Sequence, residues 1–167
     1  MMIVLDSPNW QEEKAGKLFE GDAAAYIKAS LRELGLSQSD IYVTSLVKAP
    51  KSGKQLENGQ INNCVGYLKR EIEILKPPII VALGSASIRH FLPSVKAVGD
   101  VVGKTVYLAS LDASIVCGIN PAQIVFDASK VKVLNTVLAK AAELIGVSIK
   151  TEEEEYVEET EDYSDDE

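Results

Sequence analysis

INNCVGYLKREIEILKPPIIVALGSAS, residues 61–87, contains in one stretch the segments from which an α/β fold is built. Apolar residues recur at helical spacing in its first half, which predicts an amphipathic helix over residues 59–76. Pro77-Pro78 ends that helix, because the residue before a proline avoids helical geometry. The apolar run Ile79–Leu83 follows and predicts a strand that is buried on both faces, as in a parallel sheet. Gly84-Ser85 then turns the chain into a second, short helix.

The same alternation of segments extends to both sides of this stretch. Apolar or β-branched runs predict further strands, and amphipathic stretches with capping residues predict further helices. The predicted strands are residues 2–5, 41–47, 79–83 and 114–117, and the predicted helices are residues 23–34, 59–76, 85–91 and 128–145. This order predicts a three-layer α/β/α sandwich with a central, mostly parallel four-stranded sheet. Val101–Leu108 contains a further, interrupted β stretch.

The composition is that of a folded domain with a separate acidic end. Of the 167 residues, 46% are hydrophobic and 25% are charged, which excludes collagen-like, wholly disordered and membrane-embedded proteins. Residues 151–167 hold 11 of the 25 acidic residues and none of the 17 basic ones, so residues 1–150 carry +3 although the chain carries −8. We predict one domain over residues 1–150, and the abrupt start of its first strand leaves room for a missing N-terminal segment.

Residues 151–167 have too few apolar side chains to form a core and are predicted to be a disordered tail or linker. Three roles fit this segment. It is a solvating terminus or interdomain linker, or a tail that folds over the basic loop at residues 48–54 and competes with DNA, or a docking segment for a replication partner.

A binding site is expected beyond the carboxyl ends of the strands, where ligands of open parallel sheets lie. The polar segments that follow the first, second and last of the four predicted strands are residues 6–21, 45–54 and 118–127. The chain has no GxGxxG, GxxxxGK[ST], HExxH or GxSxG motif, which argues against the common nucleotide, protease and esterase sites.

The polar segments carry motifs of a known family. LDSPNWQEEKAGKLFEGDAAAYI (5–27), IYVTSLVKAP (41–50), the stretch quoted first and GINPAQI (118–124) occur in the order of the family motifs, and Pro8, Gly16, Phe19 and Gly21 match without a gap. Over about residues 2–146 the chain resembles the uracil-DNA glycosylase superfamily. It is most similar to the iron–sulfur (family 4) branch, and similar modules are joined to bacteriophage DNA polymerases. The resemblance implies the family's fold and the flipping of a base out of DNA.

The resemblance assigns roles to four residues at the strand ends. Asp6 stands where the family has a glutamate and is expected to polarise water or to offset charge on the sugar, unless it only caps a turn. Phe19 matches the aromatic on which the flipped base stacks, the alternative being a core residue. Ser45 replaces the asparagine that reads uracil, and one hydroxyl cannot make both contacts of an amide. Asn120 replaces the histidine that donates to the departing base, a step that an amide can also perform.

Further residues are expected to contact DNA. Gln123, in the loop after the last predicted strand, matches the segment that presses on DNA at the flipping site, unless this loop is only a polar turn. Lys48, Lys51 and Lys54 lie in the basic loop and are expected to bind phosphates. His90 lies outside the polar segments and is expected to be structural.

No cofactor or metal is expected. The iron–sulfur branch needs four cysteine ligands, and two of those positions are Ala49 and Cys64 here, while the other two fall upstream of the chain. Cys117, the second of the two cysteines, reads as a buried free thiol. The protein is therefore expected to be colourless.

Three functions are compatible with these residues. The first is a DNA-binding, glycosylase-like module of phage DNA replication or repair in which base excision is weakened or lost. The second is an active glycosylase for uracil or a modified pyrimidine, and the third is an interaction protein without DNA. Expected partners are single- or double-stranded DNA and a DNA polymerase, in the same polypeptide or separate. No apolar run approaches the roughly 18 residues that span a bilayer, so the expected location is the cytoplasm, of a bacterial host if the chain is phage-encoded.

Overall fold

A five-stranded sheet with strand order β2-β1-β3-β5-β4 forms the centre of the molecule. The computed structural model describes the backbone of residues 1–161 and the side chains of residues 1–146. The strands are β1 (Met2–Leu5), β2 (Tyr42–Ser45), β3 (Ile79–Leu83), β4 (Thr105–Leu108) and β5 (Ala113–Gly118). β2, β1, β3 and β5 are parallel, and β4 runs antiparallel to β5. The predicted class, a mostly parallel α/β sheet, is confirmed.

The sheet has one strand more than predicted. The fifth strand is β4, whose residues alternate between exposed and half-buried, so it lacks the continuous apolar run that marks the central strands. A tight turn between β4 and β5 requires a positive φ of 48° at Asp112 and returns the chain antiparallel. The predicted count of four was therefore wrong, and β4 is the second half of the interrupted β stretch noted at Val101–Leu108.

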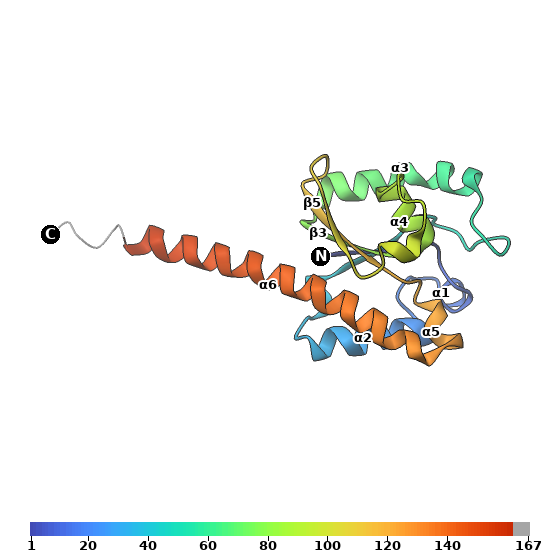
Figure 1. The fold of residues 1–167 in the computed structure, drawn as a ribbon, viewed down its shortest axis with the longest axis horizontal. Helices are drawn as coiled ribbons and strands as arrows, with labels where there is room; N and C mark the ends of the chain where they lie inside the picture. Colours follow the sequence, from blue (N-terminus) through green and yellow to red (C-terminus); the bar gives the residue numbers. More distant parts are fainter. Residues whose placement is uncertain (162–167) are drawn as a thin grey trace.

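Helices cover both faces of the sheet (Figure 1). The α-helices are α1 (Trp10–Ala15), α2 (Asp22–Glu33), α3 (Asn58–Leu75), α4 (Ser85–Phe91), α5 (Ala122–Phe126) and α6 (Val131–Glu161), and the short 3-10 helices are η1 (Gln38–Asp40), η2 (Val98–Asp100) and η3 (Ala128–Lys130). No helix within the described residues is long and apolar enough to cross a membrane.

The core has two halves, one on each face of the sheet, because side chains of a strand alternate between its faces. In β1, Met2 and Val4 pack with residues of α3 and α4, whereas Ile3 and Leu5 pack with residues of α2 and α6. All four of these strand residues are buried. A strand buried on both faces needs a helical layer on each, so the three-layer prediction is confirmed.

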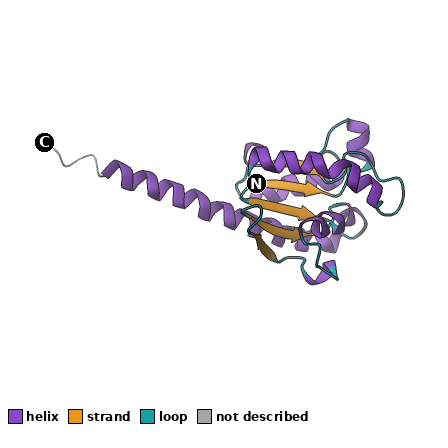
Figure 2. Ribbon diagram, turned by 90° about the horizontal axis from the view of Figure 1, so that it is seen from above, coloured by secondary structure: helices purple, strands orange, loops and turns teal. Residues whose placement is uncertain are grey.

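Helix α6 is longer than its predicted range. Leu134, Val137, Leu138 and Ala141 are buried against the sheet, and the later turns extend away from the body of the molecule (Figures 1 and 2). A helix nucleated on the core gains one hydrogen bond for each residue added, and glutamate is a good helix former. The structure therefore differs from the predicted disorder over residues 151–161, while residues 162–167 lie outside the described residues. The division into a domain and a tail stays a prediction.

Candidate functional site

A pocket of about 610 Å³ lies at the carboxyl ends of the parallel strands, where the sequence places the site. Its walls come from segments far apart in the chain. They include the loop after β1 with Asp6 and Asn9, α1 with Glu12, the segment after α1 with Phe19, the basic loop with Lys51 and Lys54, the start of α3 with Asn58, α4 with Arg89 and His90, the loop after β5 with Asn120, and α5 with Gln123. The three predicted residues Asp6, Phe19 and Asn120 are thus brought together across more than a hundred positions.

Asp6 lies in the pocket and also caps α4. Its Oδ1 accepts hydrogen bonds from the backbone N and from Oγ of Ser87, each 2.8 Å long. Burial raises the pKa of the carboxyl group, opposed by the hydrogen bonds from Ser87 and by the charge of Lys51. Both roles considered from the sequence, site carboxylate and turn cap, are therefore compatible with its position.

Gly84 is the residue that makes room for this carboxylate. Its φ is 135°, and a Cβ built on it would lie 2.2 Å from Oδ2 of Asp6. Only glycine tolerates both this backbone conformation and this approach. The turn at Gly84-Ser85 is therefore part of the construction of the site.

Glu12 is a buried carboxylate of the pocket wall that the sequence reasoning did not select. Its Oε1 accepts from the backbone N of Asn9 at 3.0 Å, and its Oε2 accepts from the backbone N of Phe19 at 2.6 Å. The Asn9 side chain in turn accepts from the backbone N of Glu12, which completes a capping box at the start of α1. An Asn followed three residues later by Glu is the sequence signal that could have revealed it.

Phe19 is held at the pocket in a backbone conformation that is uncommon for a non-glycine residue. Its φ is 66°, and the hydrogen bond to Glu12 fixes its N–H. The Nζ of Lys28 lies 5.1 Å from the ring centroid, within the range of a cation–π contact. The ring is half-buried and lines the pocket, a position compatible with the predicted stacking on a base.

The loop after β5 contributes an amide side chain. Oδ1 of Asn120 accepts from the backbone N of Ala122 at 3.0 Å and so fixes the start of α5. Within the described residues, the amide NH₂ of Asn120 has no acceptor, which leaves it available as a donor to a ligand. Gln123 is exposed and lies on the pocket wall one residue further into α5.

Ser45 does not line the pocket, contrary to the prediction that it shares one pocket with the other three residues. It is the last residue of β2, paired in register with Leu5, and it is 0% exposed. Its hydroxyl is buried without a hydrogen-bond partner among the described residues. The side chain is too short to leave the layer in which its strand holds it, so it ends inside the protein. Its base-reading role stays a prediction.

The three predicted DNA-binding lysines occupy different environments. Nζ of Lys48 lies 2.6 Å from a carboxylate oxygen of Glu71 and 2.7 Å from both Oγ1 of Thr44 and the carbonyl oxygen of Ser45. Lys48 therefore ties the basic loop to β2 and α3 and is not part of the pocket wall. Lys51 and Lys54 are exposed on that wall, and no ion pair engages them within the described residues.

Helix α4 places two further residues at the pocket, Arg89 and His90. Burial, followed by the charge of Lys69, lowers the pKa of His90, which keeps its imidazole neutral near pH 7. The ring packs edge-on against Phe91, with centroids 4.9 Å apart. His90 lies outside the three polar segments but lines the pocket, and the structural role expected for it stays a prediction. Its helix starts where β3 ends, so the strand-end rule could have placed it there.

The residues of this chain do not fit an iron–sulfur cluster. Cys117 is buried in β5, and Cys64 is half-buried on α3 with its Sγ 3.4 Å from the backbone N of Lys48. Two thiols placed in this way cannot replace the four ligands of a cluster. Within the described residues, no group of three or more His, Cys, Asp or Glu side chains could hold a metal ion.

The family model of the uracil DNA glycosylase superfamily matches residues 1–142. The type-4 uracil-DNA glycosylase of Pyrobaculum aerophilum is 33% identical over 109 residues, which cover 62% of this chain and 56% of the relative. The chain thus spans about half the length of the curated glycosylases that it matches.

Two DNA polymerases are also similar to the chain. The DNA polymerase of Bacillus phage SP01 is 33% identical over 106 residues, 62% of this chain and 11% of the polymerase. The DNA polymerase III subunit alpha of Yersinia pestis is 29% identical over 147 residues, 87% of this chain and 12% of the subunit. Because the family model covers most of the chain and the pocket lies where the motifs meet, this chain belongs to the uracil DNA glycosylase superfamily.

Proposed function

We propose that the chain is a DNA-binding, uracil-DNA glycosylase-like module of DNA replication or repair, which holds an unstacked nucleotide in its pocket and has weakened or lost base excision. The observation that carries this proposal is the position of Ser45. The residue expected to read the base is sealed inside the protein and lies outside the pocket. A pocket without this reader can hold a nucleotide with little selectivity for uracil.

The charge and the lining of the pocket support DNA as the ligand. Lys51, Lys54 and Arg89 are exposed cations at its wall, in a domain whose residues 1–150 carry +3. Phosphates bind such cations through the release of condensed counterions. Phe19 adds an aromatic ring on which a base can stack.

The surroundings of Asp6 support weakened excision. Excision needs a group that supports water attack on the sugar and a donor for the departing base. Oδ1 of Asp6 already accepts two hydrogen bonds from Ser87, and burial opposes the charged form of the carboxyl group. Asn120 offers a neutral NH₂ donor, and a neutral donor stabilises a leaving anion less than a charged one.

A polymerase is the partner that we propose for this module. The two polymerases reported above contain a segment similar to this chain within a much longer polypeptide. A nucleotide-binding module beside a polymerase would contact template strand that is already single-stranded, so extrusion of the base from a duplex would cost little.

Binding and excision measured on the same oligonucleotides test the proposal. Anisotropy of a fluorescein-labelled single strand measures binding, and alkaline cleavage after incubation detects abasic sites. We expect binding with little difference between uracil and thymine at one position, and excision far slower than that of the Pyrobaculum aerophilum glycosylase under matched conditions. Absence of binding would overturn the proposal. Excision as fast as that of the Pyrobaculum aerophilum glycosylase would overturn the part of the proposal that base excision is weakened or lost.

The second candidate is an active glycosylase for uracil or a modified pyrimidine. It is favoured by the meeting of Asp6, Phe19 and Asn120 in one pocket. Excision of uracil or a 5-substituted uracil that disappears in the Asp6→Asn variant, with binding retained, would favour this candidate over the first.

A further inference from the structure

Two large aromatic side chains on helices that contribute to the pocket wall are largely exposed. The exposed fraction is 69% for Trp10, the first residue of α1, and 90% for Phe126, the last residue of α5. A partner that stacks on these rings removes apolar surface from water, which favours binding.

Both residues belong to elements that flank the pocket. Trp10 directly follows Asn9, and Phe126 lies one helical turn beyond Ala122 and Gln123, all three of which line the pocket. Residues three and four apart share one face of a helix, so Phe126 continues the face that begins at the pocket. Figure 1 shows α1 and α5 at the same end of the molecule.

We propose that Trp10 and Phe126 are stacking platforms for the unpaired bases next to the nucleotide held in the pocket, so that the module binds single-stranded DNA. This inference rests on the proposed DNA-binding function and names the form of its ligand. The bases of a duplex are already stacked on their neighbours, and only an unpaired strand offers faces to exposed rings. The occupant is DNA because the helices that carry the two rings also line a pocket with Lys51, Lys54 and Arg89, cations that suit its phosphates.

Trp10 makes the inference directly measurable, because it is the single tryptophan of the chain. Base stacking quenches indole fluorescence, whereas a phosphate contact elsewhere leaves it almost unchanged. Titration of the full chain with a single-stranded oligothymidylate is expected to quench Trp10, and the same titration with a duplex of equal length is expected to quench it much less. Quenching that is equal with the duplex, or absent with the single strand, would overturn the inference.

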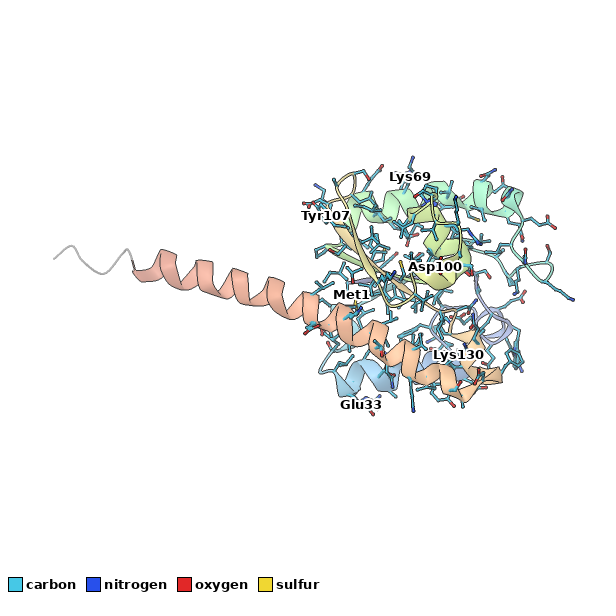
Figure 3. All side chains as sticks on the ribbon, viewed as in Figure 1. Met1, Glu33, Lys69, Asp100, Tyr107 and Lys130 are labelled. Atoms are coloured by element: carbon cyan, nitrogen blue, oxygen red, sulfur yellow. The ribbon has the colours of Figure 1, made fainter. Side chains whose placement is uncertain are left out.

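Substitutions test the two rings by affinity. Trp10→Ala and Phe126→Ala are each expected to weaken single-strand binding about tenfold, measured by anisotropy of a labelled oligonucleotide. Tyr107→Ala is the matched control, because Tyr107 is 61% exposed on β4 (Figure 3), away from α1 and α5 in the view of Figure 1. Melting curves of the Trp10 and Phe126 variants should match that of the wild type, since both side chains are exposed.

The possible failures are distinguishable. A wild-type chain that binds no DNA overturns both this inference and the proposed function. A chain that binds single strands with unchanged affinity after both substitutions overturns the stacking platforms only. Capture of a polymerase that both substitutions abolish, together with unchanged DNA affinity, would assign the rings to a protein interface and overturn the inference.

Discussion

Oε2 of Glu12 lies 2.6 Å from the backbone N of Phe19, seven residues further along the chain. The hydrogen bond supports a φ of 66° at Phe19, a conformation that costs a non-glycine residue about 1 kcal/mol or more. A buried carboxylate thus fixes the ring expected to meet the base. Glu12 is therefore a positioning residue, which acts through Phe19.

Glu12→Gln should destabilise the protein and weaken nucleotide binding. An amide presents an oxygen to only one of the two backbone N–H groups, those of Asn9 and Phe19, and leaves the other unsatisfied. We expect a loss of about 1–3 kcal/mol in the free energy of unfolding, measured by urea denaturation.

Glu13→Gln is the control for this substitution, because Glu13 is the exposed neighbour of Glu12 on α1. Its effect should stay within about 0.5 kcal/mol. If the Glu12→Gln and Glu13→Gln variants were equally stable, the positioning role assigned to Glu12 would be wrong.

Gly84→Ala should be strongly destabilising, whereas Gly66→Ala should stabilise. At Gly84 the new methyl group would collide with the Asp6 carboxylate, in a backbone conformation that L-residues avoid. At Gly66, inside α3, no atom lies within 4 Å of the new Cβ. We expect a loss of about 2 kcal/mol or more at Gly84 and a gain of about 1 kcal/mol at Gly66, from thermal melts of both variants. A tolerated alanine at Gly84 would show that Asp6 does not occupy that space.

The raised pKa of Asp6 predicts a pH dependence of stability. Between pH 3.8 and the raised value the folded state binds more protons than the unfolded state, so the free energy of unfolding falls as the pH rises through this window. Asp6→Asn removes the titration. The stability of the variant relative to the wild type should therefore increase from acid to neutral pH in urea denaturation at a series of pH values.

Asp127→Asn provides a control of opposite sign. Hydrogen bonds from the side chain and backbone of Ser129 lower the pKa of Asp127, so the wild-type residue contributes stability above pH 3.8 and loses it as the pH falls. The stability of this variant relative to the wild type should decrease toward neutral pH. Parallel slopes for the Asp6 and Asp127 variants would contradict the assignment.

The lysines of the basic loop should separate into two classes. Lys48→Ala removes the ion pair with Glu71 and two hydrogen bonds, so we expect a loss of about 1–2 kcal/mol in the free energy of unfolding. Lys51→Ala and Lys54→Ala should leave stability unchanged and weaken DNA binding. Each should also reduce the slope of log affinity against log salt by about 0.7 for a single strand. A loss of stability in Lys51→Ala would contradict this division. An unchanged slope of log affinity against log salt in both Lys51→Ala and Lys54→Ala would also contradict it.

Deletion of residues 151–167 should tighten DNA binding at low salt. The 11 acidic residues of this segment belong to the same chain as a domain of +3, and at low salt their charge repels DNA phosphates over about 30 Å at 0.01 M. The gain should shrink as salt rises, because charges are screened beyond about 10 Å at 0.1 M. Equal affinities of the full-length and truncated chains at low salt would instead favour a linker or docking segment.

The sequence predicted the central strands because each is a continuous apolar run, as Ile79–Leu83 shows. It indicated only an interrupted β stretch at residues 101–108 and did not count the edge strand β4 in the sheet, because the residues of β4 alternate between exposed and half-buried. In the site, Asp6, Phe19 and Asn120 were predictable because motif order and the strand-end rule agree. The burial of Ser45 depends on how deep the end of β2 lies. The capping box of Glu12 is visible in the sequence, but its hydrogen bond to Phe19 depends on how the chain turns after α1. The local sequence pattern encodes neither the depth of a residue in the fold nor its contacts with a neighbouring loop.

The cap that Asp6 provides to α4 joins two walls of the pocket. Oδ1 of Asp6 holds the first turn of α4 through Ser87, and Arg89 and His90 reach the pocket from the next turn of the same helix. A ligand that donates a hydrogen bond to Oδ1 of Asp6 competes with Ser87 for the same acceptor. Binding at Asp6 therefore weakens the hydrogen bonds that fix the first turn of α4. We therefore expect binding at Asp6 and the placement of the Arg89 cation to be coupled, each shifting the other by the same free energy.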